Sequence, residues 1–211
     1  MDRVTTATAI AGAPTLVHRP LSILERFDWG SLFPGAQPVE LELGSGDGSF
    51  LLQWAQLHRE RNFLGVERLL GRLRKLDRKG LRAGLTNLRV IRLEAAYLLE
   101  YMVPARTLSA IHVYFPDPWP KRKHRDRRLI NTHFTTLAAT ALVPGGTVWL
   151  RTDDEDYFNQ MVEVFGADRR FTAVGTPEEL SGVTTDFERH FNAQGIPTRR
   201  AGYQLTPPPA T

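Results

Sequence analysis

The 211-residue sequence contains no cysteine, which removes several kinds of chemistry at once. Without thiols the chain can form no disulfide, no thiolate zinc site and no cysteine nucleophile. The six histidines are scattered without the spacing of metal ligands, so we expect no metal ion. The sequence has neither an apolar run long enough to cross a bilayer nor a secretory signal pattern at its amino terminus. We therefore expect a cytoplasmic protein with no membrane partner.

The composition suits one globular domain with a locally basic surface. At 42% hydrophobic residues the chain can bury one sizeable core. Its formal net charge is only +4, and the excess is concentrated: residues 121–128 hold six Lys or Arg in eight positions. A local excess of this kind indicates that one face contacts a polyanion. We expect an arm and preamble over 1–35, a domain over 36–206 and a disordered tail over 207–211.

From Val39 onward the sequence alternates strand-like and helix-like patterns. This alternation predicts a layered α/β fold with a mostly parallel sheet. The expected helices cover 68–84, 129–143, the stretch that follows residue 153, and one that begins near Phe50 and buries Phe50, Trp54 and Leu57. The expected strands cover 39–43, 62–67, 87–94, 107–115, 147–152 and 171–175, with a last strand reaching residue 205.

The first expected strand runs directly into Gly44, Gly46 and Gly48, and a helix follows. Such a glycine-rich turn lets the backbone approach a nucleotide cofactor closely. A dinucleotide fingerprint has the spacing G-x-G-x-x-G, whereas here Ser49 takes the place of the last glycine and the spacing is G-x-G-x-G. This favours S-adenosylmethionine over NAD. A plain tight turn without a ligand is the alternative.

Three carboxylates stand at or near the ends of the first three expected strands. Glu42, two residues before Gly44, suits the cationic amino-acid moiety of S-adenosylmethionine and would repel a pyrophosphate. Glu67 stands about 20 residues after the turn, where an acid commonly binds ribose hydroxyls, and Glu94 can accept from an adenine amino group. Because parallel strands end at one edge of a sheet, we expect these side chains in one cofactor pocket.

The stretch Tyr114 to Arg128, YFPDPWPKRKHRDRR, combines an isolated acid, aromatic residues and a basic strip. Prolines on both sides of Asp117 restrict the backbone and push the residue before each of them toward extended geometry. We therefore expect Phe115 and Asp117 to be stiffly presented at the cofactor crevice, while Tyr114 or Trp119 stacks on a base. The alternative is a solvated proline-rich loop. Six side chains suit a phosphate backbone: Lys121, Arg122, Lys123, Arg125, Arg127 and Arg128.

Other polar residues receive simpler interpretations. We expect His112 to be packed in the core and Asp153, at the end of a strand, to face the crevice. Acids at 154–156 suit the first turn of a helix without any further function. The basic face of residues 68–84 is predicted to be solvated, with a supporting role in holding RNA phosphates as the alternative.

Six segments together resemble the bacterial tRNA (guanine-N7-)-methyltransferase family, and they span nearly all of 39–204. FPDPW followed by a lysine and a basic run is the most specific of them, and T-x-F-E followed by F-x-x-x-G-x-P is an independent match. The segments are ELGSGDG, NFLGVE, NLRV, FPDPWPKRKHRDRR, RTDDEDY and TDFERHFNAQGIPTRR.

The resemblance implies a Rossmann-like, S-adenosylmethionine-dependent methyltransferase fold with a seven-stranded, mostly parallel sheet whose last strand is antiparallel. It implies methylation of N7 of the variable-loop guanine, position 46, of tRNA by a monomer or homodimer, with Asp117 at the reaction centre and in the cofactor site beside Glu42, Glu67 and Glu94. Glu94 and Asp186 depart from the family pattern, which usually has Asp and often Lys at these places. The implied substrate contacts are Lys121, Asp153, Thr185, Asp186, Phe187 and Glu188.

The chemistry agrees with this inventory. Guanine N7 already exposes a lone pair, so its methylation requires alignment but no strong base and no cysteine. The purine becomes cationic, and a carboxylate such as Asp117 can stabilise the developing charge. Two other hypotheses remain at this point: a nucleotide-binding oxidoreductase, which Ser49 and Glu42 argue against, and a non-catalytic RNA-binding module.

Overall fold

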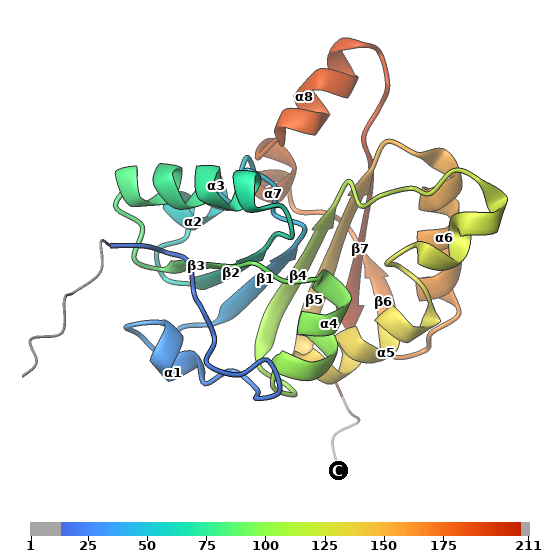
Figure 1. Ribbon diagram of the computed structural model, residues 1–211. Coiled ribbons are helices and arrows are strands. Elements are labelled where there is room, and N and C mark those ends of the chain that lie inside the picture. The colour runs from blue at the N-terminus through green and yellow to red at the C-terminus, as the bar shows by residue number, and fades with distance from the viewer. Residues whose placement is uncertain (1–13, 208–211) are drawn as a thin grey trace, which may run out of the picture.

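A seven-stranded sheet with helices on both faces forms the centre of the protein (Figure 1). The computed structural model describes residues 14–207, so the start of the expected arm (1–13) and the last four residues of the expected tail (208–211) lie outside the described part. The strands are β1 (Val39–Leu43), β2 (Asn62–Val66), β3 (Leu88–Ile91), β4 (Leu108–Tyr114), β5 (Leu142–Thr152), β6 (Phe171–Val174) and β7 (Arg199–Leu205).

The strand order β3-β2-β1-β4-β5-β7-β6 places the first and fourth strands side by side. All neighbours from β3 to β5 are parallel, whereas β7 is antiparallel to both β5 and β6. This confirms the predicted α/β fold with a single antiparallel last strand. The chain direction reverses between β1 and β4, and in open parallel sheets ligands bind at such a switch point, outside the carboxyl ends of the strands.

Two sets of helices cover the two faces of the sheet, each with its own buried cluster. One face carries α1 (Trp29–Leu32), α4 (Ala95–Tyr97), the π-helical turn η1 (Leu98–Met102), α5 (Thr132–Ala141) and α6 (Glu155–Gly166). The other carries α2 (Leu51–Leu57), α3 (Leu70–Arg82) and α7 (Glu178–Gly182). A 3-10 turn, η2 (Arg122–Arg127), follows β4, and α8 (Asp186–Ala193) projects at the top of Figure 1.

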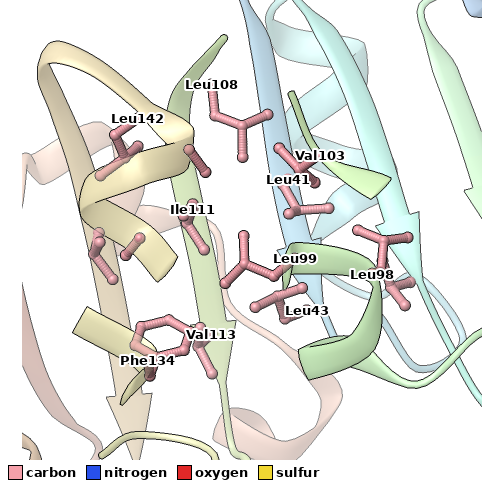
Figure 2. Packing of buried hydrophobic residues seen from close by; sticks show 14 of the residues in the cluster. Leu41, Leu43, Leu98, Leu99, Val103, Leu108, Ile111, Val113, Phe134 and Leu142 are labelled. Atoms are coloured by element: carbon pink, nitrogen blue, oxygen red, sulfur yellow. The ribbon is translucent and has the colours of Figure 1, made fainter. Parts of the chain in front are cut away.

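The central strands are buried on both faces. Figure 2 shows Ile111 and Val113 of β4 between Phe134 of α5 and Leu99 of η1. In β1 the sequence V-E-L-E-L alternates apolar and acidic residues, yet all five residues are buried. The alternation therefore does not mark a solvent-facing side here, and the acids of β1 must find partners or ligands inside the protein.

Some expected element bounds were wrong, for local reasons. Helix α5 ends at Ala141 and β5 begins at Leu142, so the Pro-Gly-Gly segment lies within the strand, at a shift in its register with β4. Helix α2 begins at Leu51, which rotates the buried face: Leu51 and Ala55 are buried with Trp54, whereas Leu57 is 58% exposed. The short segments α1, α4, η1, η2 and α7 were not predicted, because they are too brief to show periodicity.

Part of the preamble packs onto the domain. Val17 pairs with Val90 of β3, and Phe27, Leu32 and Phe33 join the core cluster under η1 and α5. Among residues 14–207, no helix has both the length and the apolar composition that a bilayer span requires.

The central position of β4 predicts a large effect of truncating its core. We expect Ile111→Ala, at a fully buried site, to lower the free energy of unfolding by about 2 to 5 kcal/mol, because it leaves a cavity. Val162→Ala in α6, where the side chain is 43% exposed, is the matched control and should change it by no more than about 0.5 kcal/mol. Denaturant titration with equal m values measures both. Similar small losses would contradict this assignment of the core.

Candidate active site

An open cleft of about 410 Å³ lies beyond the carboxyl ends of β1, β2, β3 and β4. It brings together Glu67, Glu94 and Asp117, which lie far apart in the sequence, with Gly44 beside them. The prediction that the strand ends meet in one crevice is therefore confirmed for these residues. Its walls also include Leu69, Phe115 and Trp119, and three arginines that were not predicted to line it: Arg68, Arg72 and Arg127.

The glycine-rich turn has the conformation that its sequence predicts. Gly44, Gly46 and Gly48 have φ values of 82°, 57° and 85°, in the left-handed region that favours glycine. Nothing lies within 4 Å of the place where a side chain would start at Gly44 or Gly46, whereas at Gly48 it would meet Leu76 at 2.8 Å. The first two glycines thus leave open space for a ligand, and the third allows helix α3 to pack closely.

Glu67 fastens this turn to the end of β2. Its Oε2 accepts from the backbone N–H of Gly46 at 3.0 Å, and its Oε1 accepts from that of Leu69 at 2.6 Å. Each carboxylate oxygen has a second lone pair. The side chain can therefore hold the turn in place and still accept a hydrogen bond from a ribose hydroxyl, which is the role expected for it.

Glu42 is buried behind the turn, and its Oε2 has no hydrogen-bond partner among the described residues. Burial raises its pKa to about 8; the charge of Glu67 adds to this rise, and the Arg151 guanidinium opposes it. An unpartnered buried carboxylate costs free energy unless a donor or a cation meets it. The arrangement fits the ammonium group of S-adenosylmethionine.

Glu94 has a local role that the sequence analysis missed. It is the N-cap of α4, where its two oxygens accept from the backbone N–H groups of Ala96 at 3.0 Å and Tyr97 at 2.7 Å. The signal was a strand-ending acid just before a short helix, a common capping position. Glu94 lines the cleft as well, so it fixes the rim where an adenine would lie.

The loop after β4 does not have the extended backbone that was predicted for it. Phe115 and Trp119, each followed by a proline, have φ values of 51° and 45°. Proline disfavours the right-handed helical conformation before it, and here the backbone takes the rare left-handed alternative. Such conformations persist only where the surroundings enforce them. Asp117, between these two residues, is exposed at the mouth of the cleft.

Arg128 enforces the shape of this loop. It is 2% exposed, and its Nε donates to the carbonyl oxygen of Pro118 at 2.7 Å. Its other nitrogens donate to Gln160 at 2.8 Å and Asp156 at 2.6 Å on α6, and its guanidinium lies 4.8 Å from the ring centre of Tyr157. The prediction that Arg128 binds phosphate was therefore wrong.

The rest of the basic strip is largely free. Arg125 is held by Asp156 at 2.8 Å, so that this acid has a structural function that was not expected. Arg127 lies over the ring of Trp119 at 5.1 Å and covers one of its faces. The exposed cations without an ion pair in residues 14–207 are Lys121, Arg122, Lys123 and Arg127.

Tyr114 is not available to a base, contrary to the prediction. Only 7% of it is exposed, and its ring packs against Phe50 at 4.6 Å and the Arg151 guanidinium at 4.2 Å. Its hydroxyl lies 2.8 Å from Nδ1 of His112, whose Nε2 lies 2.8 Å from Glu40. The expectation that His112 is a packed core residue is confirmed.

Thr185 and Glu188 are buried in a capping box at the start of α8, away from the surface expected of substrate contacts. The Thr185 hydroxyl accepts from the Glu188 N–H at 3.0 Å, and Glu188 Oε2 accepts from the Thr185 N–H at 2.9 Å. Glu188 also pairs with Arg151 at 2.8 Å and with Arg200 at 2.7 Å. These two residues therefore position α8.

The exposed residues of α8 lie against the cofactor turn and the Asp117 loop. The Asp186 N–H donates to Ser49 Oγ at 3.2 Å. Phe187 is 46% exposed, and its ring stacks with that of Phe115 at 5.9 Å. Asp153 is half-buried just beyond β5, where its carbonyl oxygen accepts from Arg199 at 3.3 Å. Within residues 14–207 no cluster of three or more acids or histidines has metal-binding geometry.

Comparisons with known proteins agree with this geometry. A family model described as "Putative methyltransferase" matches residues 36–201. A tRNA (guanine-N(7)-)-methyltransferase of Halorhodospira halophila is 36% identical over 193 residues, covering 85% of this chain and 80% of that protein. Another, of Nitrosomonas eutropha, is 38% identical over 150 residues, 68% of this chain and 64% of that protein. The structure of the 16S rRNA methyltransferase KamB, 15% identical, shares the fold with a TM-score of 0.62 over 85% of this chain and 93% of that one.

The burial of Glu42 predicts a pH dependence of stability. Its pKa is about 8 in the folded protein against an ordinary value of 4.5, so between these values the folded state holds a proton that the unfolded state lacks. The contribution of Glu42 to the free energy of unfolding therefore falls as pH rises from 5 to 8. In denaturant titrations, Glu42→Gln should gain stability relative to wild type as pH rises, whereas the exposed control Glu163→Gln should not. A constant difference across pH would contradict the burial of an unpartnered carboxyl.

The clamp formed by Arg128 predicts that its loss loosens the Asp117 loop. Arg128→Met removes hydrogen bonds from a charged donor and should cost roughly 2 to 4 kcal/mol of unfolding free energy. It should also speed cleavage between residues 115 and 128 by a non-specific protease, mapped by mass spectrometry. Arg125→Met, which removes only an exposed contact to the same acid, is the control and should cost less than about 1 kcal/mol. Equal effects of the two variants would show that the clamp does not hold the loop.

Proposed function

The chain belongs to the tRNA (guanine-N7-)-methyltransferase family, and from this premise we propose that the cleft at the carboxyl ends of β1 to β4 is its active site, where guanine 46 of the tRNA variable loop is methylated. S-adenosylmethionine is the methyl donor and tRNA the acceptor. The single observation that carries the proposal is the exposed carboxylate of Asp117 at the mouth of the cleft that Glu67 and Glu94 line. We assign the activity to the cytoplasm and to a monomer or homodimer.

The cofactor is held, in this proposal, by residues from three strand ends. Glu42 meets the ammonium group, because its buried oxygen lacks a partner among the described residues. Glu67 accepts from the ribose, and the rim capped by Glu94 contacts the adenine. Gly44 and Gly46 leave space for the cofactor beside the turn. When bound, S-adenosylmethionine supplies an electrophilic methyl group on a sulfonium centre.

Asp117 orients the guanine and stabilises its charge. The N7 lone pair needs no deprotonation before it forms the new bond, so alignment is the main requirement. The Asp117 carboxylate can accept from the N1 and N2 donors of the base and lies where positive charge develops on the purine. Within residues 14–207 its side chain has no hydrogen-bond partner, which leaves it free to serve the substrate.

The target base must leave the folded tRNA to reach this carboxylate. The exposed ring of Phe187, stacked beside Phe115, offers a flat face at the cleft in place of the buried Tyr114. Lys121, Asp153 and Asp186 face the RNA around it. Thr185 and Glu188 serve the substrate through α8, which their capping box holds in place.

Incubation with labelled S-adenosylmethionine and tRNA tests the proposed function directly. Nucleoside analysis should find 7-methylguanosine, and sequencing of the product should map it to position 46. Label in another nucleoside, or at another guanine, would overturn the assignment of the target.

Asp117 provides the sharper test of the site. Asp117→Ala should lower the single-turnover rate of methyl transfer by about 100- to 1000-fold, because a preorganised partner of the developing charge is lost. Asp117→Asn, which keeps the shape but not the charge, should retain intermediate activity. Calorimetric titration with S-adenosylhomocysteine should give nearly unchanged affinity in both variants. Near-normal turnover of Asp117→Ala would move the reaction centre, with Asp153 as the next candidate.

A further inference from the structure

Basic residues are concentrated in two segments of the chain. Residues 68–82, which contain α3, hold seven Lys or Arg and one acid, and residues 121–128 hold six and one. Together they account for 13 of the 27 basic and two of the 23 acidic residues, so 14 basic and 21 acidic residues remain for the rest of the chain. The modest net charge of +4 thus conceals two strongly positive segments on an otherwise negative protein.

The charges of α3 are arranged at a cost to the helix. Like-charged residues follow one another at a spacing of four, as in the pairs Arg74–Arg78 and Arg78–Arg82, and each such pair destabilises a helix by about 0.2 to 0.5 kcal/mol. Arg72 lies in the first turn, which contains no acid, and there the helix dipole disfavours a cation. An ordinary solvated helix face mixes both signs. A polyanion bound along α3 would remove these costs.

Nearby acids neutralise little of this charge. Asp47 pairs with Lys79 at 2.9 Å and with Lys75 at 3.7 Å. Asp77, the single acid of the helix, accepts instead from the hydroxyl of Thr15 and the backbone N–H of Leu16. Five exposed arginines have no ion pair within the described residues: Arg68, Arg72, Arg74, Arg78 and Arg82.

The two basic segments meet at the active-site cleft from different sides. Arg68 and Arg72 line it from the start of α3, and Arg127 lines it from η2. In Figure 1, α3 lies to the left of the end of β4, whereas the yellow-green chain of η2 lies to the right, beside α6. Helix α3 is about 20 Å long, so its basic face extends well beyond the cleft.

We propose that the exposed face of α3 is a second phosphate-binding surface, so that the tRNA backbone crosses the cleft and is held on both sides of the extruded guanine. This inference rests on the proposed function, because tRNA is the polyanion that the cleft receives. The apolar side of α3, with Leu73 and Leu76, is buried in the core, and its cations remain for contact with the ligand. Cations on both sides give the leverage needed to hold a strand while one base is withdrawn.

The test neutralises two arginines of α3 that do not line the cleft. In Arg74→Gln/Arg78→Gln, tRNA affinity should fall by about 25- to 60-fold at 0.1 M salt, and the slope of log K against log salt should decrease by about 1.4 to 1.8. The KM for tRNA should rise in parallel. Affinity for S-adenosylhomocysteine should stay within about twofold of the wild-type value, because these residues lie outside the cofactor pocket.

A matched control separates this surface from general charge. Arg106→Gln/Arg169→Gln removes two exposed arginines, one before β4 and one after α6, and should leave the salt slope unchanged. Equal slopes for wild type and Arg74→Gln/Arg78→Gln would overturn the proposal, as would loss of binding to anionic phospholipid vesicles with tRNA binding retained. Because slopes report binding, they are independent of catalysis: a wild-type protein that binds tRNA but forms no 7-methylguanosine would refute the proposed function instead.

Discussion

The buried guanidinium of Arg151 holds the catalytic half of the molecule together. It lies at the end of β5, donates to Glu188 at 2.8 Å and to backbone carbonyl oxygens of Val183 and Leu180, and stacks on Tyr114 of β4. Removing one partner of a buried ion pair typically costs 3 to 5 kcal/mol, so this contact constrains everything around it. The positions of α7, α8 and the end of β4 all depend on one side chain.

The same charge sets the electrostatics of the cofactor pocket. Arg151 opposes the rise in the pKa of Glu42, which burial and Glu67 cause. Glu67 in turn fixes the glycine turn through the Gly46 N–H. The acids behind the turn therefore keep a negative potential ready for a cationic ligand, while Arg151 and the hydrogen bonds of Glu67 keep the fold from paying its full cost in repulsion.

Arginine has two separate roles in this protein. Arg128 and Arg151 are buried, donate most of their N–H groups to oxygens of the protein, and give shape to the Asp117 loop and to α8. The exposed cations of η2 and α3 have few or no acidic partners among the described residues, and they are available to a polyanion. A guanidinium serves both purposes because its planar set of donors suits carboxylates, carbonyls and phosphates alike.

The sequence by itself determined the α/β fold, the glycine turn and the acids at the strand ends, because periodicity and position within a strand fix where each strand stops. It could not decide which charged residues are buried. Arg128 is held by Asp156 and Gln160, about 30 residues away, and Glu188 by Arg151, 37 residues away. Burial and pairing arise from segments that meet only in the tertiary structure, so local patterns cannot distinguish Arg128 from Arg127, or Tyr114 from Phe187.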